Sequence, residues 1–216
     1  MDTRELRDAY RRLARWYDLA EALPEILGIG RLRRRMLARA RGNVLEVAAG
    51  TGKNFRFYPA RLNLVAVDLS AEMLQLACRR AAQLHRGYRF ALMDAAGLAF
   101  PDRSFDTVVS TLSTCTFPEP VRALREISRV CCPDGRILLI EHGRSDRAWA
   151  ARRQDRHAEA HERRFGCQWN REPIEMVREA GLSIVQAARH FAGIFHTIEA
   201  RPGEDRFPGE RKGDAR

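Results

Sequence analysis

The feature that most constrains the fold is a series of short apolar runs that alternate with amphipathic segments. The runs cover residues 44–47, 64–67, 88–93, 105–110, 136–141, 182–188 and 194–200. Helices are expected at residues 71–84, 120–130 and 171–180, and Ser70 is placed to cap the first of them. Apolar strands alternating with helices are typical of an α/β domain whose mostly parallel sheet is covered on both faces.

Two further segments carry local signals. Residues 53–58 follow a glycine-rich turn and are expected to open a helix. Residues 133–135, Pro-Asp-Gly, are expected to form a turn that leads into the strand at 136–141.

Composition divides the chain into three parts. Residues 1–41 hold two amphipathic, arginine-rich segments and are expected to form an N-terminal helical cap. Residues 42–200 carry the alternating strands and helices, with a substrate-side insertion at 142–170. Residues 201–216 contain three glycines and two prolines and are expected to form a disordered tail.

Hydropathy and cysteine usage indicate the compartment. The mean hydropathy is -0.42, no apolar run is long enough for a membrane span, and the N-terminus lacks the apolar region of a secretory signal. Five cysteines, with no C-x₂-C spacing, indicate a reducing cytoplasm and neither a disulfide framework nor a zinc motif: Cys78, Cys115, Cys131, Cys132 and Cys167.

Small and acidic residues at successive strand ends predict a ligand site. Ligands of open α/β sheets lie beyond the carboxyl ends of the strands. Here the first strand is followed by the turn 48–52 (AAGTG), the second ends at Asp68, the third at Asp94, and the fourth leads into residues 110–114. Asp68 lies 18 residues beyond Gly50, close to the spacing at which an acidic residue binds a ribose diol.

The spacing of the glycines argues against two common phosphate ligands. A dinucleotide site needs a small residue three positions beyond Gly52, where Phe55 stands. A nucleotide P-loop needs Ser or Thr after Lys53, where Asn54 stands, and an earlier glycine. The turn is therefore better suited to another adenosyl cofactor.

Five segments taken together resemble consecutive motifs of the class I S-adenosylmethionine (SAM) methyltransferases, in their quinone and phospholipid branch. They are residues 45–52, 67–74, 94–102, 104–109 and 125–135. The resemblance covers about residues 10–142 and implies a Rossmann-like, doubly wound seven-stranded sheet whose last strand is antiparallel. Residues 57–59, 140–142 and 165–172 are similar to segments of alkyl-thiol S-methyltransferases.

The resemblance implies SAM as cofactor and assigns its contacts by position. They are Tyr17 over the cofactor, Glu46, Ala48, Gly50 and Gly52 at the methionine part, Asp68 at the ribose, Met73, Asp94 and Ala95 at the adenine, and Thr111 beneath the sulfonium. The family usually has glycine at position 48, so we expect the backbone of Ala48 to avoid positive φ, or the amino-acid end of SAM to sit differently. Without the resemblance, Met73 would be interpreted as a core methionine, and Asp94 and Asp106 as residues that form turns at strand ends. For Asp106 this turn-forming role is the preferred interpretation.

The catalytic candidates are His142 and Cys115. Methyl transfer needs proximity, alignment and a dry pocket, and a base only when the acceptor arrives protonated. His142 directly follows the fifth strand and is the candidate base. Cys115 is the second candidate, and the alternative interpretation is that it is a small buried apolar residue. His157 and His161 share a helix face, but no third ligand is evident, so no metal site is expected.

The chain is thus predicted to be a SAM-dependent methyltransferase for a small, lipophilic or membrane-associated acceptor: a quinone, a phospholipid headgroup or a thiol. An RNA or protein methyltransferase and a non-catalytic SAM-binding protein are the alternatives. No aromatic stacking platform accompanies the basic residues, so a nucleic-acid partner is not expected, and the oligomeric state stays open.

The net charge of +10 is unevenly distributed along the 216 residues. Residues 1–41 carry +5, residues 42–143 carry +2 and residues 144–216 carry +3. Two solvated helices, at residues 4–20 and around residues 31–39, are the simple interpretation, and peripheral contact with the anionic inner membrane surface is the alternative. Neutralising Arg31, Arg33, Arg34 and Arg35 is expected to weaken adsorption to anionic vesicles and to leave SAM affinity nearly intact.

Overall fold

The computed structural model describes residues 25–203, and the structural statements below concern this part of the chain. The helix expected at residues 4–20, the predicted contact Tyr17 and most of the expected tail lie outside the described residues.

Seven strands form one sheet in the order β3-β2-β1-β4-β5-β7-β6. Their bounds are β1 (Asn43–Val47), β2 (Asn63–Asp68), β3 (Arg89–Leu92), β4 (Phe105–Thr111), β5 (Cys131–His142), β6 (Ser183–His190) and β7 (Phe195–Arg201). The pairs from β3 to β5 are parallel, and β7 is antiparallel to both of its neighbours. The α/β class and the antiparallel last strand are therefore confirmed.

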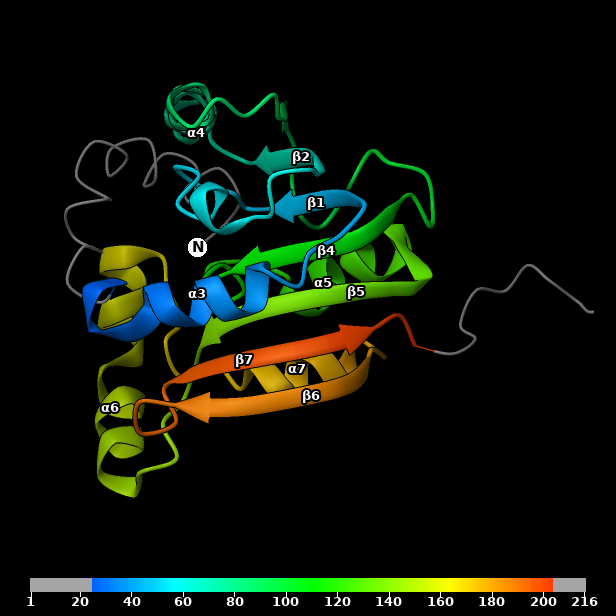
Figure 1. Cartoon of the computed structure of the whole chain (residues 1–216). Coiled ribbons are helices and arrows are strands. Elements are labelled where there is room, and N and C mark those ends of the chain that lie inside the picture. The colour runs from blue at the N-terminus through cyan, green and yellow to red at the C-terminus, as the bar shows by residue number, and fades with distance from the viewer. Residues whose placement is uncertain (1–24, 204–216) are drawn as a thin grey trace, which may run out of the picture.

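Helices cover both faces of this sheet (Figure 1). They are a short segment η1 (Glu25–Ile29), α3 (Gly30–Leu37), the 3-10 turn η2 (Phe55–Phe57), α4 (Ala71–Gln83), α5 (Pro120–Val130), α6 (Ala148–Phe165) and α7 (Pro173–Glu179). Ser70 caps α4 as expected, because its hydroxyl accepts a hydrogen bond from the Met73 amide at 3.2 Å.

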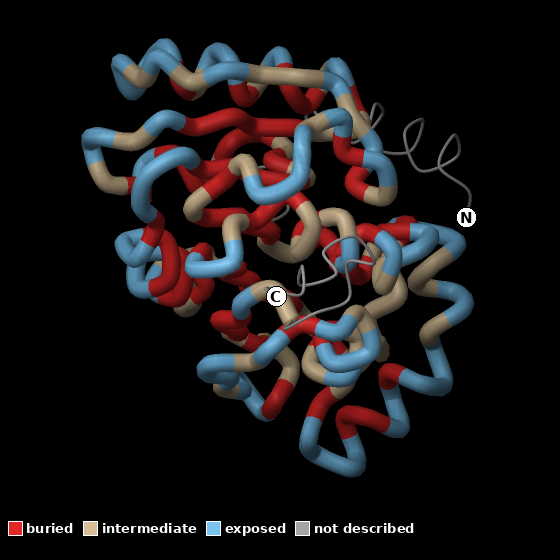
Figure 2. The backbone as a smooth tube through the Cα atoms, turned by 90° about the vertical axis from the view of Figure 1, so that its right-hand side faces the viewer, coloured by how far each residue is buried: buried red, intermediate tan, exposed pale blue. Residues whose placement is uncertain are grey.

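Two apolar cores lie on opposite faces of the sheet. One contains Leu124 of α5 and Val177 of α7, and the other contains Met36 of α3 and Ala77 of α4. The central strands β1, β2, β4 and β5 are buried along most of their length, whereas the edge strands β3 and β6 contain no buried residue and the helices expose their outward sides (Figure 2). The long helix α6 lies beyond the carboxyl end of β5 (Figure 1).

Two local expectations are wrong. Residues 53–58 form only the single turn η2, because Tyr58 is extended with ψ at 145° and Pro59 follows. Residues 133–135 lie inside β5, where pairing with β4 skips from Cys131–Phe105 to Arg136–Thr107. The Pro-Asp-Gly sequence therefore makes an irregularity within a strand and not a turn before one.

Within residues 25–203, no helix is both long and apolar enough to cross a bilayer.

Candidate functional site

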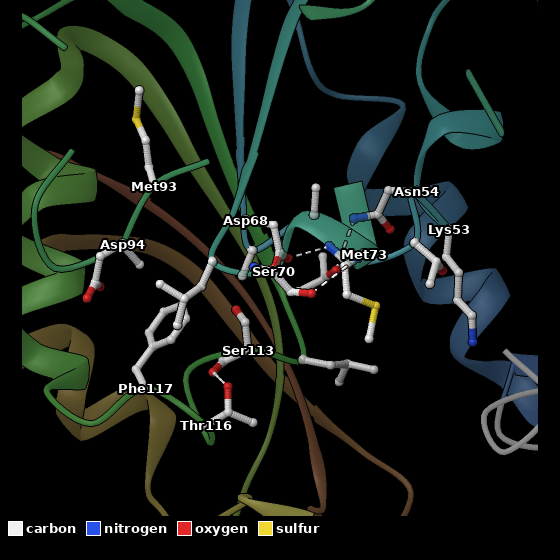
Figure 3. Close-up of a pocket in the computed structure, with 18 of the residues that line it drawn as sticks. Lys53, Asn54, Asp68, Ser70, Met73, Met93, Asp94, Ser113, Thr116 and Phe117 are labelled. Carbon is white, nitrogen blue, oxygen red and sulfur yellow. Dashed lines mark hydrogen bonds between the residues drawn. The ribbon is translucent and has the colours of Figure 1, made fainter. Parts of the chain in front are cut away.

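A pocket opens at the carboxyl ends of β1, β2 and β4. Its empty space is about 930 Å³ including the open mouth, a size that suits a small ligand. Figure 3 shows Lys53 and Asn54 on one side of the pocket and Asp94 and Phe117 on the other.

Seven of the predicted cofactor contacts line this pocket: Ala48, Gly50, Asp68, Met73, Asp94, Ala95 and Thr111. Glu46 and Gly52 lie behind the lining, next to residues that form it. Residues that the sequence did not single out also line the pocket, among them Arg33, Lys53, Asn54, Thr116 and Phe117, and Ser113 lies within the expected segment 110–114.

The turn after β1 leaves its backbone open to a ligand. Ala48 has φ at +53°, so the first of the two alternatives for this residue is wrong, and a different position of the amino-acid end of SAM stays a prediction. Holding Ala48 at positive φ costs about 1–2 kcal/mol. A Cβ on Gly50 would meet nothing within 4 Å, which leaves space for a ligand against the backbone. A Cβ on Gly52 would lie 2.4 Å from the Phe55 ring, so packing requires that glycine.

Asp68 fits the predicted ribose-binding position. Its two oxygens accept hydrogen bonds from the amides of Gly50 at 2.8 Å and Ser70 at 2.9 Å. A carboxylate offers about four acceptor sites, so positions remain for two hydroxyls. Burial raises the pKa of Asp68, and the amide hydrogen bonds partly offset this rise.

Met73 and the two other aspartates separate into different roles. Met73 is 2% exposed and lines the pocket, so it belongs to the core and to the site at once. Asp94 accepts a hydrogen bond from the Ala96 amide at 2.9 Å at the pocket edge. Asp106 is not the turn former that was expected, because it lies within β4 and accepts a hydrogen bond from the Asn43 amide of β1 at 2.8 Å.

Arg33 connects four parts of the fold beside the pocket. Its guanidinium donates to Glu25 at 2.7 Å, to Asn54 at 2.7 Å and to Thr111 at 2.8 Å. Arg33 is 3% exposed, so its expected place among the surface arginines is wrong. The physical reason is its position three and four residues before Met36 and Leu37, on the buried face of α3.

Glu46 completes this buried network. Its carboxylate accepts hydrogen bonds from Asn54 at 2.8 Å and from the Tyr58 hydroxyl at 2.8 Å. Burial raises the pKa of Glu46 to about 7, although Tyr58, Asn54 and Arg33 act in the opposite direction. Glu46 therefore positions Asn54, which lines the pocket.

The two catalytic candidates lie together outside the pocket lining. Cys115 is 2% exposed, and His142 places Nε2 3.3 Å from Sγ of Cys167. The base role of His142 and the catalytic role of Cys115 stay predictions. His157 is exposed, whereas His161 stacks on Trp169 with ring centroids 4.2 Å apart.

Replacing Arg33 should destabilise the fold. We expect Arg33→Met to lower the free energy of unfolding by about 3 kcal/mol or more, because it leaves Glu25 without its buried counter-charge and Asn54 and Thr111 without their donor. Urea unfolding measures this, with Arg34→Met on the exposed face as the control. Equal losses in the two variants would contradict the role of the buried network.

Glu46 should make stability depend on pH. Its folded-state pKa of about 7 is above the ordinary pKa of 4.5 for a glutamate, so the folded protein holds this proton more tightly than the unfolded chain. Its contribution is complete below pH 4.5 and is lost as the pH rises to about 7. Urea unfolding across this range should show a shallower decline for Glu46→Gln than for the unchanged protein; identical slopes would refute the assignment.

Known proteins resemble this chain over about half of its length or more, and one family model matches its central part. Residues 45–139 match the family described as "Methyltransferase domain". The mitochondrial methyltransferase OMS1 of Saccharomyces cerevisiae is 27% identical over 100% of this chain and 48% of its own length. Phosphatidylethanolamine N-methyltransferase of Cereibacter sphaeroides is 37% identical over 49% of this chain and 53% of its own length. Demethylmenaquinone methyltransferase of Renibacterium salmoninarum is also 37% identical, over 54% of this chain and 51% of its own length. The chain thus spans about half the length of these relatives.

The fold has relatives among solved structures. The YcgJ protein of Bacillus subtilis superposes with a TM-score of 0.61 at 25% identity, over 74% of this chain and 71% of its own. The seven-stranded sheet, the pocket at its strand ends and the matched domain agree with one another. Residues 45–139 therefore form a methyltransferase domain, and the match to this family implies S-adenosylmethionine as its cofactor.

Proposed function

We propose that the protein transfers a methyl group from SAM to a small lipophilic acceptor. The proposal rests on one observation: the turn at Gly50, the carboxylate of Asp68 and the side chain of Met73 line the same pocket. These residues offer backbone, hydroxyl-binding and apolar contacts to the three parts of an adenosyl-methionine molecule.

The chain's own residues would bind and orient the cofactor. Asp68 would accept hydrogen bonds from the ribose, Met73 would pack on the adenine, and Thr111 would lie near the reacting centre. Bound SAM supplies a methyl group that is already activated by a sulfonium. Leu112 and Phe117 line the pocket and would exclude water while an acceptor aligns with that methyl.

The acceptor is proposed to be apolar or carried by a membrane. Two relatives are named for phosphatidylethanolamine and demethylmenaquinone, and both names describe lipophilic acceptors. Leu112, Phe117 and Pro118 give the pocket an apolar wall. Arg31, Arg34 and Arg35 are exposed on α3, where they could contact an anionic inner membrane surface from a cytoplasmic location.

Calorimetry tests cofactor binding. We expect SAM and its demethylated product to bind, and Asp68→Asn to weaken SAM binding about tenfold, since one charge-assisted hydrogen bond contributes about 1.5 kcal/mol or more. Asp106→Asn is the matched control, because Asp106 also accepts a backbone amide but lies outside the pocket lining. The absence of heat with either compound would refute the proposed function.

The acceptor class can be identified by labelling. The protein is incubated with methyl-labelled SAM and a cell extract, which is then separated into lipid, small-molecule, protein and RNA fractions. We expect label in the lipid or small-molecule fraction, and about tenfold less of it with Asp68→Asn at low SAM concentration. Label in RNA or protein would replace the proposed acceptor, and no label with SAM bound would indicate a non-catalytic SAM-binding protein.

Variants of the exposed α3 arginines test membrane contact separately from cofactor binding. Arg31, Arg34 and Arg35 changed together to Gln should weaken partitioning onto anionic vesicles about 100-fold, at about 1 kcal/mol for each charge. SAM affinity should be preserved, because Arg33 remains. The control changes Arg79, Arg122 and Arg125, which are exposed on α4 and α5. Equal partitioning of both variants and the unchanged protein would show that the α3 arginines are only a solvated surface.

A further inference from the structure

Two thiols and an imidazole from distant parts of the sequence meet beside the pocket. Cys115 lies in the loop after β4, His142 ends β5, and Cys167 follows α6. Their potential ligand atoms all lie within 4.8 Å of one another, and Sγ of Cys167 is 3.3 Å from Nε2 of His142. Among residues 25–203 this is the one cluster of three such groups.

The geometry points to a metal site at Cys115, His142 and Cys167, and we propose that it binds one Zn²⁺ ion. Ligand atoms of a tetrahedral zinc site lie about 3.5–3.8 Å apart, as follows from bond lengths of about 2.3 Å to sulfur and 2.0–2.1 Å to nitrogen. The observed separations fit this size with small side-chain rotations. Two thiolates and an imidazole favour zinc over magnesium or calcium.

The three ligands are held in place by the chain itself. Gly166 ends α6 with φ at 67°, which turns the chain so that Cys167 reaches the cluster. The amide of Gln168 donates to the carbonyl of Cys115 at 2.9 Å, and the amide of Arg144 donates to the carbonyl of Arg171 at 2.8 Å. These contacts hold all three segments together, so a ligand variant can keep the fold.

The charges around the cluster suit the ion. Zn²⁺ with two thiolates and a neutral imidazole has no net charge, which lowers the cost of burying it. Beside it, Arg171 donates to the carbonyls of Thr114 and Phe117, and Glu141 accepts from the amides of Ser113 at 2.9 Å and Thr114 at 3.1 Å. The fourth position of the ion has no protein ligand within the cluster, as in zinc sites that bind water or another small ligand.

The proposed ion would connect the pocket to the segment after α6. Ser113, Thr116 and Phe117 line the pocket, while Cys115 between them belongs to the cluster. Zinc would therefore hold the pocket loop, the end of β5 and residues 166–171 as one rigid unit. This inference is independent of the methyl acceptor and of SAM binding.

Metal content and cobalt spectra test the site in the full chain, purified without chelator and with a phosphine reductant. We expect about one zinc per chain by mass spectrometry, and cobalt added to the metal-free protein should give the intense visible bands and thiolate charge-transfer bands of a tetrahedral site. Zinc should displace the cobalt. Cys167→Ser and His142→Gln should each weaken metal binding by more than about 100-fold. This is more than the loss of about 10- to 100-fold that follows when only a hydrogen-bond partner of a ligand is replaced. Cys78→Ser and Cys132→Ser are the controls, since neither residue belongs to the cluster.

Alkylation of the thiols in the unchanged protein provides a second measurement. Zinc should slow the reaction of Cys167 with a maleimide and leave that of the exposed Cys78 unchanged. Calorimetry with SAM on the same samples distinguishes the zinc proposal from the proposed function. A sample that binds SAM but no metal contradicts the zinc site and leaves the proposed function standing. The proposal is overturned if the full chain takes up no metal, if Cys167→Ser keeps the cobalt spectrum, or if Cys115 and Cys167 are found joined as a disulfide under these reducing conditions.

Discussion

The buried guanidinium of Arg33 is the interaction on which the arrangement of the site depends. One side chain of α3 binds Glu25, the loop residue Asn54 and Thr111 of β4, and Asn54 in turn binds Glu46 of β1. A buried charge is costly unless it is paired and hydrogen-bonded, and here its donors have partners on several elements. The same contacts that remove this cost fix the walls of the pocket relative to one another.

Sheet order brings the predicted cofactor contacts together. Because β1 lies between β2 and β4, the turn at Gly50 stands beside Asp68 on one side and Thr111 on the other. The Gly50 amide and the Asp68 carboxylate already bind each other, which sets the conformation of the turn before any ligand arrives. Preorganisation of this kind reduces the ordering cost that a bound molecule has to overcome.

The sequence was informative where local signals and topology agree. Strand ends, the Ser70 cap and seven of the pocket residues could be predicted, because a parallel sheet places the residues after its strands at one edge. The charge of Arg33 predicts a surface position, whereas its spacing to Met36 and Leu37 places it on the buried face of α3. Residues 133–135 look like a turn locally, but pairing with β4 keeps them inside a strand. Cys115 and Cys167 carry no spacing signal, since only the packing of two loops brings them together.

The last two residues of β5 serve two different regions. Glu141 anchors the loop that lines the pocket, and His142, the next residue, contacts Cys167. Successive side chains of a strand point to opposite faces, so a shift of β5 by one residue would exchange the two groups. Insertions or deletions within this strand would therefore damage both regions together. Changes of length in related chains should thus occur in residues 143–170, where the register of β5 is preserved.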